Sequence, residues 1–183
     1  MNKSHSNPAD SADATKSEGD RHERPKNRKL TLIASKGTLD WAYPPFILAS
    51  TAASAGYQVT MFFTFYGLQL LRKNLDLKIS ALGNPGMPMP IGMNTWMPVL
   101  GTALPGMETI LTKRMRDLIK SKGIATIQEL REYCLETKVK MIGCQMTIEL
   151  FGMKSSDFID EVEIGGAATW MENAGDATVN LFI

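Results

Sequence analysis

Residues 30–37 read LTLIASKG, and this stretch decides the fold class. Its first five residues are apolar or β-branched without interruption, which is typical of a strand buried on both faces of a parallel sheet. Ser35, Lys36 and Gly37 then end the apolar run. We therefore expect a first buried strand that starts near Leu30 and stops before Gly37.

A helix is expected directly after this strand. Thr38 or Asp40 would cap it and Gly56 would stop it. The proline pair at residues 44–45 is tolerated only in a first helical turn, so we expect the helix proper to begin near Tyr43 or Pro44.

The rest of the chain alternates between strand and helix patterns. Strands are predicted at 57–65, 139–143, 161–164 and 178–182, and helices at 67–71, 108–122, 126–136, 145–151 and from 166 onward. The helix at 108–122 carries an apolar stripe formed by Ile110, Leu111, Met115, Leu118 and Ile119. Thr126 and Glu129 have the spacing of a capping box. This alternation predicts a three-layer α/β domain with a mainly parallel sheet and right-handed crossovers.

Residues 1–28 form a polar segment of mixed charge that contains no Leu, Ile, Val or aromatic residue. Such a segment buries too little apolar surface to offset its ordering entropy, so we predict a disordered tail before an α/β domain at 29–183. No apolar run follows the first lysine, so a secretory signal is not indicated.

The charges of the 183-residue chain almost cancel: 20 Lys and Arg against 19 Asp and Glu. This balance gives no reason to expect a nucleic-acid partner. Both histidines, His5 and His22, lie in the predicted tail. Catalysis by Ser–His–Asp or Cys–His groups, and zinc sites that use imidazole, are therefore not expected in the domain. We also expect no cofactor.

Residues 79–107 form an uncharged segment with five prolines and five methionines. This proline density excludes a regular helix or central strand and predicts a long apolar loop. Its methionines favour packing or oligomer contacts; a mobile lid and a copper(I) site of thioether ligands remain alternatives.

Residues 41–71 contain no charged side chain, and 31 residues are long enough to span a bilayer once. The prolines at 44–45, Gly56 and Gln58 fit a helix–turn–strand unit better than a span. Peripheral contact of the uncharged segments with a membrane surface stays open.

Reactive groups in parallel α/β sheets collect at the carboxyl ends of the strands. Three features fall there: Lys36–Gly37, Cys144, and the Gly165–Gly166 turn. A thiol at the start of a helix faces free N–H groups, which favour the thiolate. Lys36 and the glycine turn are able to attract an anion, but both are equally typical of ordinary loops.

The two cysteines are expected to differ. Cys134 lies mid-helix without a glycine or cation beside it, so we interpret it as a core residue. On position alone, Cys144 is also compatible with a small core residue.

Several motifs resemble one known family. These are the SKGTLD run at 35–40, YPP at 43–45, FFTFYGL at 62–68, GCQM at 143–146 and VEIGG at 162–166. From about residue 30 onward the chain is similar to the DsrE/DsrF/DsrH-like family, in particular its stand-alone branch often labelled peroxiredoxin-like. The peroxidatic Pro-x-x-x-Thr/Ser-x-x-Cys motif does not precede Cys144, so peroxidase chemistry is not indicated by the residues themselves.

The resemblance implies a flavodoxin-like fold that forms homo-oligomers, and a role in sulfur trafficking. It implies that Cys144 carries a persulfide, exchanged with a TusA-like sulfur carrier or a rhodanese. We expect an ionised, accessible thiolate, with Gln145 and Met146 in the sulfur-stabilising turn and with Lys36 and Gly37 nearby. No resident metal is expected at this site.

Our sequence-based hypothesis is a cytoplasmic persulfide carrier or sulfurtransferase, with membrane association left open. The alternative is a non-catalytic interaction protein, or one associated with a membrane surface, in which Cys144 merely packs. A third hypothesis, a peroxide-reducing thiol protein, predicts rapid sulfenic acid formation at Cys144.

Overall fold

The structure is a computed structural model that describes residues 28–80 and 105–183. Within these ranges, one sheet has the strand order β4-β3-β2-β1-β5, and every neighbouring pair is parallel. The strands are β1 (Lys29–Ala34), β2 (Gln58–Phe63), β3 (Lys140–Cys144), β4 (Glu163–Gly165) and β5 (Val179–Phe182). The predicted α/β fold with a parallel sheet is confirmed.

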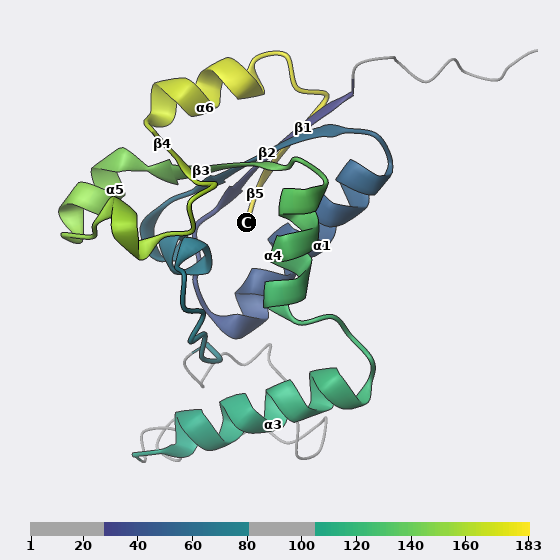
Figure 1. Cartoon of the computed structure of the whole chain (residues 1–183), viewed down its shortest axis with the longest axis vertical. Helices are drawn as coiled ribbons and strands as arrows, with labels where there is room; N and C mark the ends of the chain where they lie inside the picture. The colour runs from purple at the N-terminus through teal and green to yellow at the C-terminus, as the bar shows by residue number, and fades with distance from the viewer. Residues whose placement is uncertain (1–27, 81–104) are drawn as a thin grey trace, which may run out of the picture.

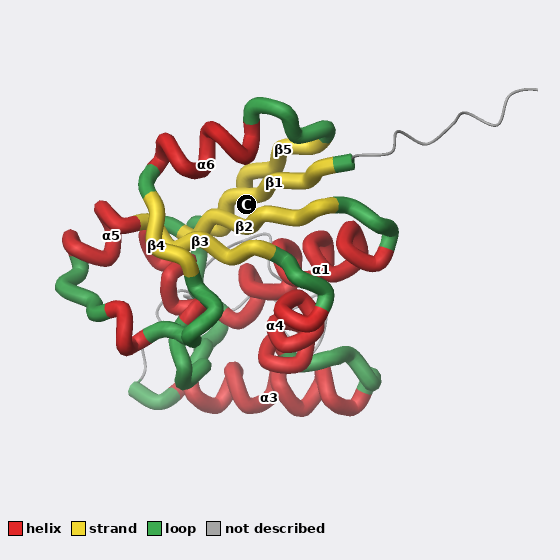
Figure 2. The backbone as a smooth tube through the Cα atoms, turned by 45° about the horizontal axis from the view of Figure 1, so that its top comes forward, coloured by secondary structure: helices red, strands yellow, loops and turns green. Residues whose placement is uncertain are grey.

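Helices cover both faces of this sheet, which gives three layers (Figure 1). Helices α1 (Leu39–Ser54) and α4 (Ile127–Glu136) pack together on one face, and α6 (Ala167–Ala174) covers the other. Two short helices, η1 (Phe65–Leu71) and α5 (Gln145–Leu150), follow β2 and β3 directly, and η2 (Ser155–Asp157) leads toward β4. Helices η1 and α5 therefore lie at the carboxyl ends of β2 and β3 (Figure 2).

The main core lies between the sheet and the α1–α4 layer. Phe46 of α1, Phe63 of β2 and Met141 of β3 are completely or almost completely buried there. Side chains alternate along each strand, so the neighbouring residues Phe62 and Ile142 point to the other face and pack with Trp170 of α6. Burial of one such large side chain contributes about 1.5–3 kcal/mol to stability.

The start of α1 differs from the prediction. The helix begins at Leu39, so Pro44 and Pro45 lie inside it rather than in its first turn. Contacts with the segment before residue 81 hold the early turn: the Leu39 amide donates to the Lys78 carbonyl, and the Asp40 carboxylate accepts bonds from the Ser80 amide and hydroxyl. These tertiary contacts offset the hydrogen bonds that the prolines cannot make.

Helix α3 (Met107–Ser121) lies outside the three layers (Figure 1). It is attached to the segment before residue 81: the Ile79 amide donates to the Thr112 hydroxyl, and Lys78 pairs with Glu108 at 3.4 Å. The predicted apolar stripe is only partly buried. Leu111 is covered, whereas Ile110 and Leu118 are exposed, because no element of the described chain packs against that side.

The predicted capping box at the start of α4 is confirmed. The Thr126 hydroxyl accepts a hydrogen bond from the Glu129 amide, and the Glu129 carboxylate accepts one from the Thr126 amide at 2.7 Å. A Thr126→Ala variant is expected to lose about 1 kcal/mol of unfolding free energy, measured by urea denaturation. The exposed change Thr178→Ser, which keeps its hydroxyl, serves as the control. Equal stability of Thr126→Ala and wild type would contradict the role of the cap.

Two predicted segments lie outside the described residues: the tail to residue 27, and residues 81–104 of the apolar loop. The prediction of a tail, the boundary at 28–29 and the copper alternative therefore stay predictions. None of the helices in the described residues is long and apolar enough to cross a membrane.

Candidate functional site

Cys144 ends β3 and is the residue from which α5 starts. It pairs with Gly165 of β4, at the carboxyl edge of the parallel sheet. Strand alternation turns its side chain to the α6 face, where it packs with Phe62 and Ile142. The structure thus places Cys144 at the strand-to-helix junction that the sequence predicted.

Hydrogen bonds set the acidity of the Cys144 thiol. Burial alone raises its pKa, and this is the largest single contribution. Against it act hydrogen-bond donors that lower the pKa: the hydroxyl and the amide of Thr147, the hydroxyl of Thr64 and the amide of Met146. Together they lower the pKa below the usual range of a cysteine thiol, because each donor stabilises the thiolate.

The two threonines form a unit. Their hydroxyl oxygens lie 3.1 Å apart, and the Phe65 amide approaches the Thr147 hydroxyl oxygen at 3.4 Å. Phe65 has a φ of 47°, in the left-handed region that is costly for a residue with a side chain. This turn after β2 brings Thr64 beside Thr147 of α5, although the two are 83 positions apart.

We expect a Thr147→Val variant to react more slowly with iodoacetamide at neutral pH, by about three- to tenfold. Loss of one donor raises the Cys144 pKa, so the midpoint of the rate-against-pH curve moves to higher pH. The measurement is the alkylation rate of Cys144 by peptide mass spectrometry from mildly acidic to alkaline pH. Thr60→Val, in β2 four residues before Thr64, leaves both hydroxyls of the Thr64–Thr147 pair in place and serves as the control. A curve that does not move would contradict the role of the hydroxyl.

The thiol is less accessible than expected. Only 5% of the Cys144 surface is exposed. The cause is its position on the α6 face, where Phe62 and Ile142 flank it and Ile33 and Trp170 pack against the same cluster. Access of a reagent to the thiol is therefore restricted by these side chains.

Exposed apolar side chains come from the two short helices beside this position. Tyr66 of η1 stacks on Phe151, which follows α5, with ring centroids 5.8 Å apart, and Phe65 meets the same ring edge-on at 6.5 Å. Met146 and Leu150 of α5 are also exposed. We call these five residues the aromatic rim. Exposed apolar patches of this kind are typical of interaction surfaces.

Lys36 and Gly37 have other contacts. The Lys36 ammonium lies 3.2 Å from the centroid of the Trp41 ring, a cation–π contact. A Cβ on Gly37 would lie 2.0 Å from the Tyr66 carbonyl oxygen, so Gly37 lets the loop after β1 pack against η1. Within the described ranges, no hydrogen bond or ion pair joins Lys36 to Cys144. Their predicted part in anion binding stays a prediction.

Gln145 and Met146 differ in what they contribute. The Gln145 side chain donates to the Glu149 carboxylate at 2.9 Å, along the exposed side of α5. The Met146 amide helps to lower the pKa of Cys144, while the Met146 side chain is exposed. The main chain of this turn therefore provides the polar contact.

Gly165 and Gly166 form the turn from β4 into α6. Gly165 lies beside Cys144 in the sheet, and a Cβ on it would meet Ile142 and Thr169 at 3.0–3.2 Å. Gly166 caps α6 without a side-chain bond. The turn thus packs α6 closely onto the Cys144 strand, and a role in anion binding stays a prediction.

Cys134 is completely buried in the main core, and burial raises its pKa to about 12. Its sulfur lies 3.9 Å from the Phe46 carbonyl oxygen, and both cysteines are free. At neutral pH it is a thiol, so the chain holds two cysteines of opposite character.

The described residues hold no cluster of three or more His, Cys, Asp or Glu side chains suited to a metal ion.

Thr64 and Thr147 were not predicted as site residues from the sequence. The TFYGL stretch that begins at Thr64 belongs to a motif that the sequence singled out, but nothing in its spacing pairs a hydroxyl with residue 147.

Comparisons with known proteins agree with the resemblance found in the sequence. The model of the DsrE/DsrF/DrsH-like family matches residues 26–182. The chain belongs to this family. A similar member is the "Sulfur carrier protein DsrE2" of Allochromatium vinosum, 60% identical over 158 residues that cover 86% of this chain and 99% of the relative. An uncharacterised protein of Bacillus subtilis, YrkE, is 29% identical over 86% of this chain and 98% of its own.

Two solved structures are also similar. The YchN protein of E. coli has a TM-score of 0.48 at 13% identity, covering 85% of this chain and 99% of its own. A protein of unknown function from Methanobacterium thermoautotrophicum, MTH1491, has a TM-score of 0.43 at 9% identity, covering 86% of this chain and all of its own.

Proposed function

We propose that this protein carries sulfur as a persulfide on Cys144 and passes it between partner thiols. The observation that supports this most directly is the position of Cys144 at the β3–α5 junction, beside the paired hydroxyls of Thr64 and Thr147, which help to lower its pKa. Membership of the DsrE/DsrF/DrsH-like family, and the name of the relative from Allochromatium vinosum, support a role in sulfur trafficking.

The transfer needs no external oxidant or reductant. The Cys144 thiolate attacks the outer sulfur of a donor persulfide, R–S–SH, and a new S–S bond forms as the old one breaks. The donor leaves as the thiolate R–S⁻, and the product on this chain is Cys–S–SH. An acceptor thiolate then attacks the outer sulfur in the same way, which returns the Cys144 thiolate.

The surroundings of Cys144 fit a carrier of a reactive group. The flanking hydrocarbon of Phe62 and Ile142 limits access of water and stray thiols to a bound persulfide. The threonine hydroxyls and turn amides stabilise the anionic sulfur in either state. The aromatic rim offers an apolar surface for a protein partner beside the thiol. The proposal also includes a TusA-like carrier or a rhodanese as the partner. It includes a homo-oligomeric state, a cytoplasmic location and formal sulfurtransferase activity.

One observation favours a second candidate. A cysteine with 5% of its surface exposed also fits a structural residue in a non-catalytic interaction protein. In that case the aromatic rim binds a partner or a membrane surface and the thiol takes no part. This candidate predicts that Cys144 in the folded chain resists iodoacetamide as completely as Cys134 does.

The test is mass spectrometry of the full chain after exposure to inorganic polysulfide near neutral pH. We expect the intact mass to rise by one sulfur atom, and the added sulfur to map to the peptide that contains Cys144. Cys134, with its pKa of about 12, is the internal reference and should gain none. A folded chain that gains no sulfur at Cys144 would overturn the proposal and leave the structural role.

A further inference from the structure

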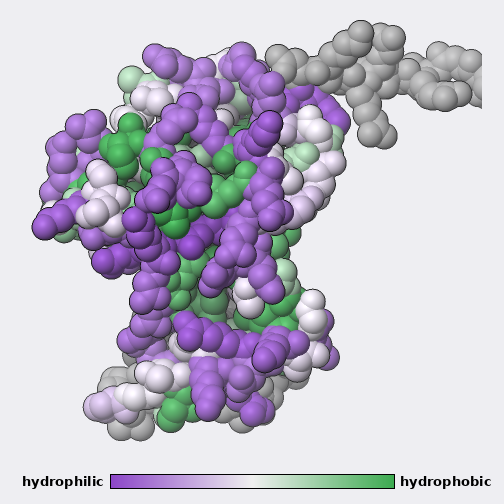
Figure 3. Space-filling model, in the orientation of Figure 1, coloured by the Kyte–Doolittle hydropathy of each residue, from purple (hydrophilic) through white to green (hydrophobic). Residues whose placement is uncertain are grey.

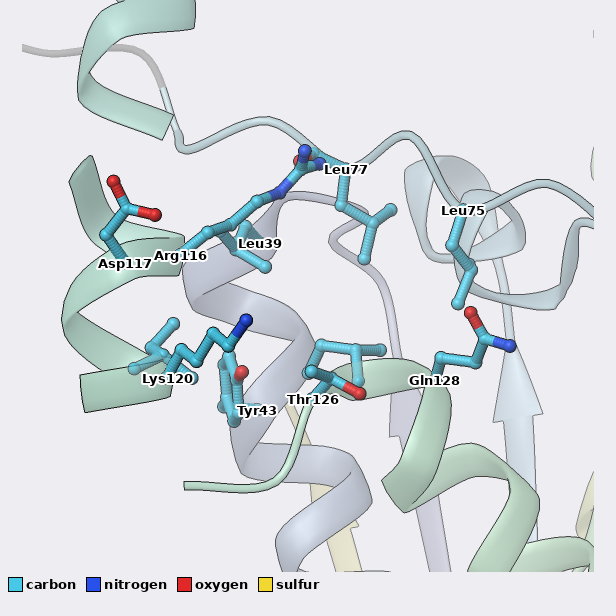
Figure 4. Close-up of a pocket in the computed structure, with 11 residues that line it drawn as sticks. Leu39, Tyr43, Leu75, Leu77, Arg116, Asp117, Lys120, Thr126 and Gln128 are labelled. Carbon is cyan, nitrogen blue, oxygen red and sulfur yellow. The ribbon is translucent and has the colours of Figure 1, made fainter. Parts of the chain in front are cut away.

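A recess of about 300 Å³ opens between α1, α3, α4 and the segment before residue 81. It is not lined by Cys144, the threonine pair or the aromatic rim. Figure 3 shows hydrophobic surface where the body of the domain meets α3, and Figure 4 shows the lining side chains. The walls of the recess are formed by Leu39, Tyr43, Leu75, Leu77, Ile119 and Ile127. Its opening is lined by Arg116, Asp117, Lys120, Thr126 and Gln128.

The walls of the recess are apolar and come from separate elements. Leu39 of α1, Leu77 of the segment before residue 81, and Ile127 of α4 are buried. Leu75 and Ile119 are half-buried. In Figure 4, Leu75 and Leu77 both point into the recess from the segment above it. Space of this volume, with apolar walls and few polar groups, is typical of a small-molecule site.

The polar groups of the recess include two cations, Arg116 and Lys120, and one carboxylate, Asp117. Arg116 donates to the Leu77 carbonyl at 2.8 Å and lies 3.6 Å from Asp76, so its charge is partly neutralised. Lys120 has no ion pair with any described residue, and in Figure 4 it reaches from α3 toward Tyr43 while Asp117 turns away. Burial raises the pKa of the Tyr43 hydroxyl, with Glu129 adding to the effect, so this group stays protonated. It donates to no described residue.

We propose that this recess binds a small amphipathic anion. Its apolar body would lie against Leu39, Leu75 and Leu77, and its anionic head would accept hydrogen bonds from the Lys120 ammonium and the Tyr43 hydroxyl. Unpaired donors at one end of an apolar recess select a ligand with an acceptor at one end of an apolar body. The proposal is independent of the sulfur chemistry at Cys144.

The experiment uses the full chain with octanoate as the probe and octanol as its neutral counterpart. Methyl NMR of the leucine and isoleucine side chains follows each titration. We expect saturable shifts at Leu39, Leu77 and Ile127, none at Leu150 of the aromatic rim, and weaker binding of octanol. The affinity for octanoate should fall as salt is raised, because the Lys120 ammonium is exposed at the opening.

Matched variants separate charge from shape. Lys120→Gln should weaken octanoate binding about three- to tenfold and leave octanol binding unchanged. Lys122→Gln, two residues along the same chain but outside the recess, should change neither. Leu75→Glu, at a half-buried wall position, should abolish octanoate binding. The NMR spectrum of this variant should still show the dispersed signals of a folded chain. Equal affinities for octanoate and octanol, or no effect of Lys120→Gln, would overturn the proposal. Shifts that depend on protein concentration without any probe would assign the recess to a second copy and also overturn it.

Discussion

A Cys144→Ala variant will take up no sulfur from polysulfide and pass none to an acceptor thiol. The step requires a thiolate, and Cys144 is the cysteine at which hydroxyl and amide donors converge. We expect a loss to background rather than a partial decrease, since Cys134 stays protonated at neutral pH. The measurement is intact mass after loading, followed by a second measurement of the acceptor's mass.

The matched control is Cys134→Ala. This change leaves a small cavity in the main core and is expected to cost about 1–3 kcal/mol of unfolding free energy, with sulfur uptake unchanged. Sulfur uptake that survives Cys144→Ala but disappears with Cys134→Ala would reverse our assignment of the two thiols.

A Gly67→Ala variant is expected to destabilise the fold by about 3 kcal/mol or more. A Cβ at this position would lie 2.1 Å from the Ala34 carbonyl oxygen and 2.8 Å from its carbon, both main-chain atoms that cannot rotate away. The Gly67 amide also donates to the Ser35 carbonyl at 3.1 Å. Urea denaturation measures the loss.

The effect should extend to the thiol. Displacement of η1 from the end of β1 moves Thr64, the residue before η1, away from Cys144. We therefore expect slower alkylation of Cys144 in whatever fraction of Gly67→Ala remains folded. Gly166→Ala is the control, because a Cβ there meets nothing within 4 Å, and its cost should stay below about 1 kcal/mol. Equal stability of the two variants would contradict the close approach of η1 to β1.

The fold could be predicted from local patterns because the strands are buried runs with clear ends. The stretch 30–37 and the apolar run before Cys144 gave strands within a residue or two of β1 and β3. The start of α1 could not be predicted in the same way. Its prolines indicated a late start, and only contacts with Lys78 and Ser80, almost 40 positions away, explain why the helix begins at Leu39.

The candidate site was predicted only in part for the same reason. The position of Cys144 at a strand-to-helix turn follows from local sequence, and so does the amide of Met146. The Thr64–Thr147 pair arises from the alignment of β2 with β3 and from the left-handed turn at Phe65, neither of which local patterns encode. Burial of the thiol depends equally on α6, which reaches this face from the far end of the sequence.

The small exposed area of Cys144 has a kinetic consequence. If the sulfur reacts only in a transiently open conformation, its labelling follows the scheme of amide hydrogen exchange: the observed rate is the intrinsic rate multiplied by the open fraction. The ratio of the intrinsic rate to the observed rate is then a protection factor for the Cys144 side chain. Docking of a true acceptor would lower that factor, so the kinetics of a simple alkylating agent would report recognition without any sulfur being moved.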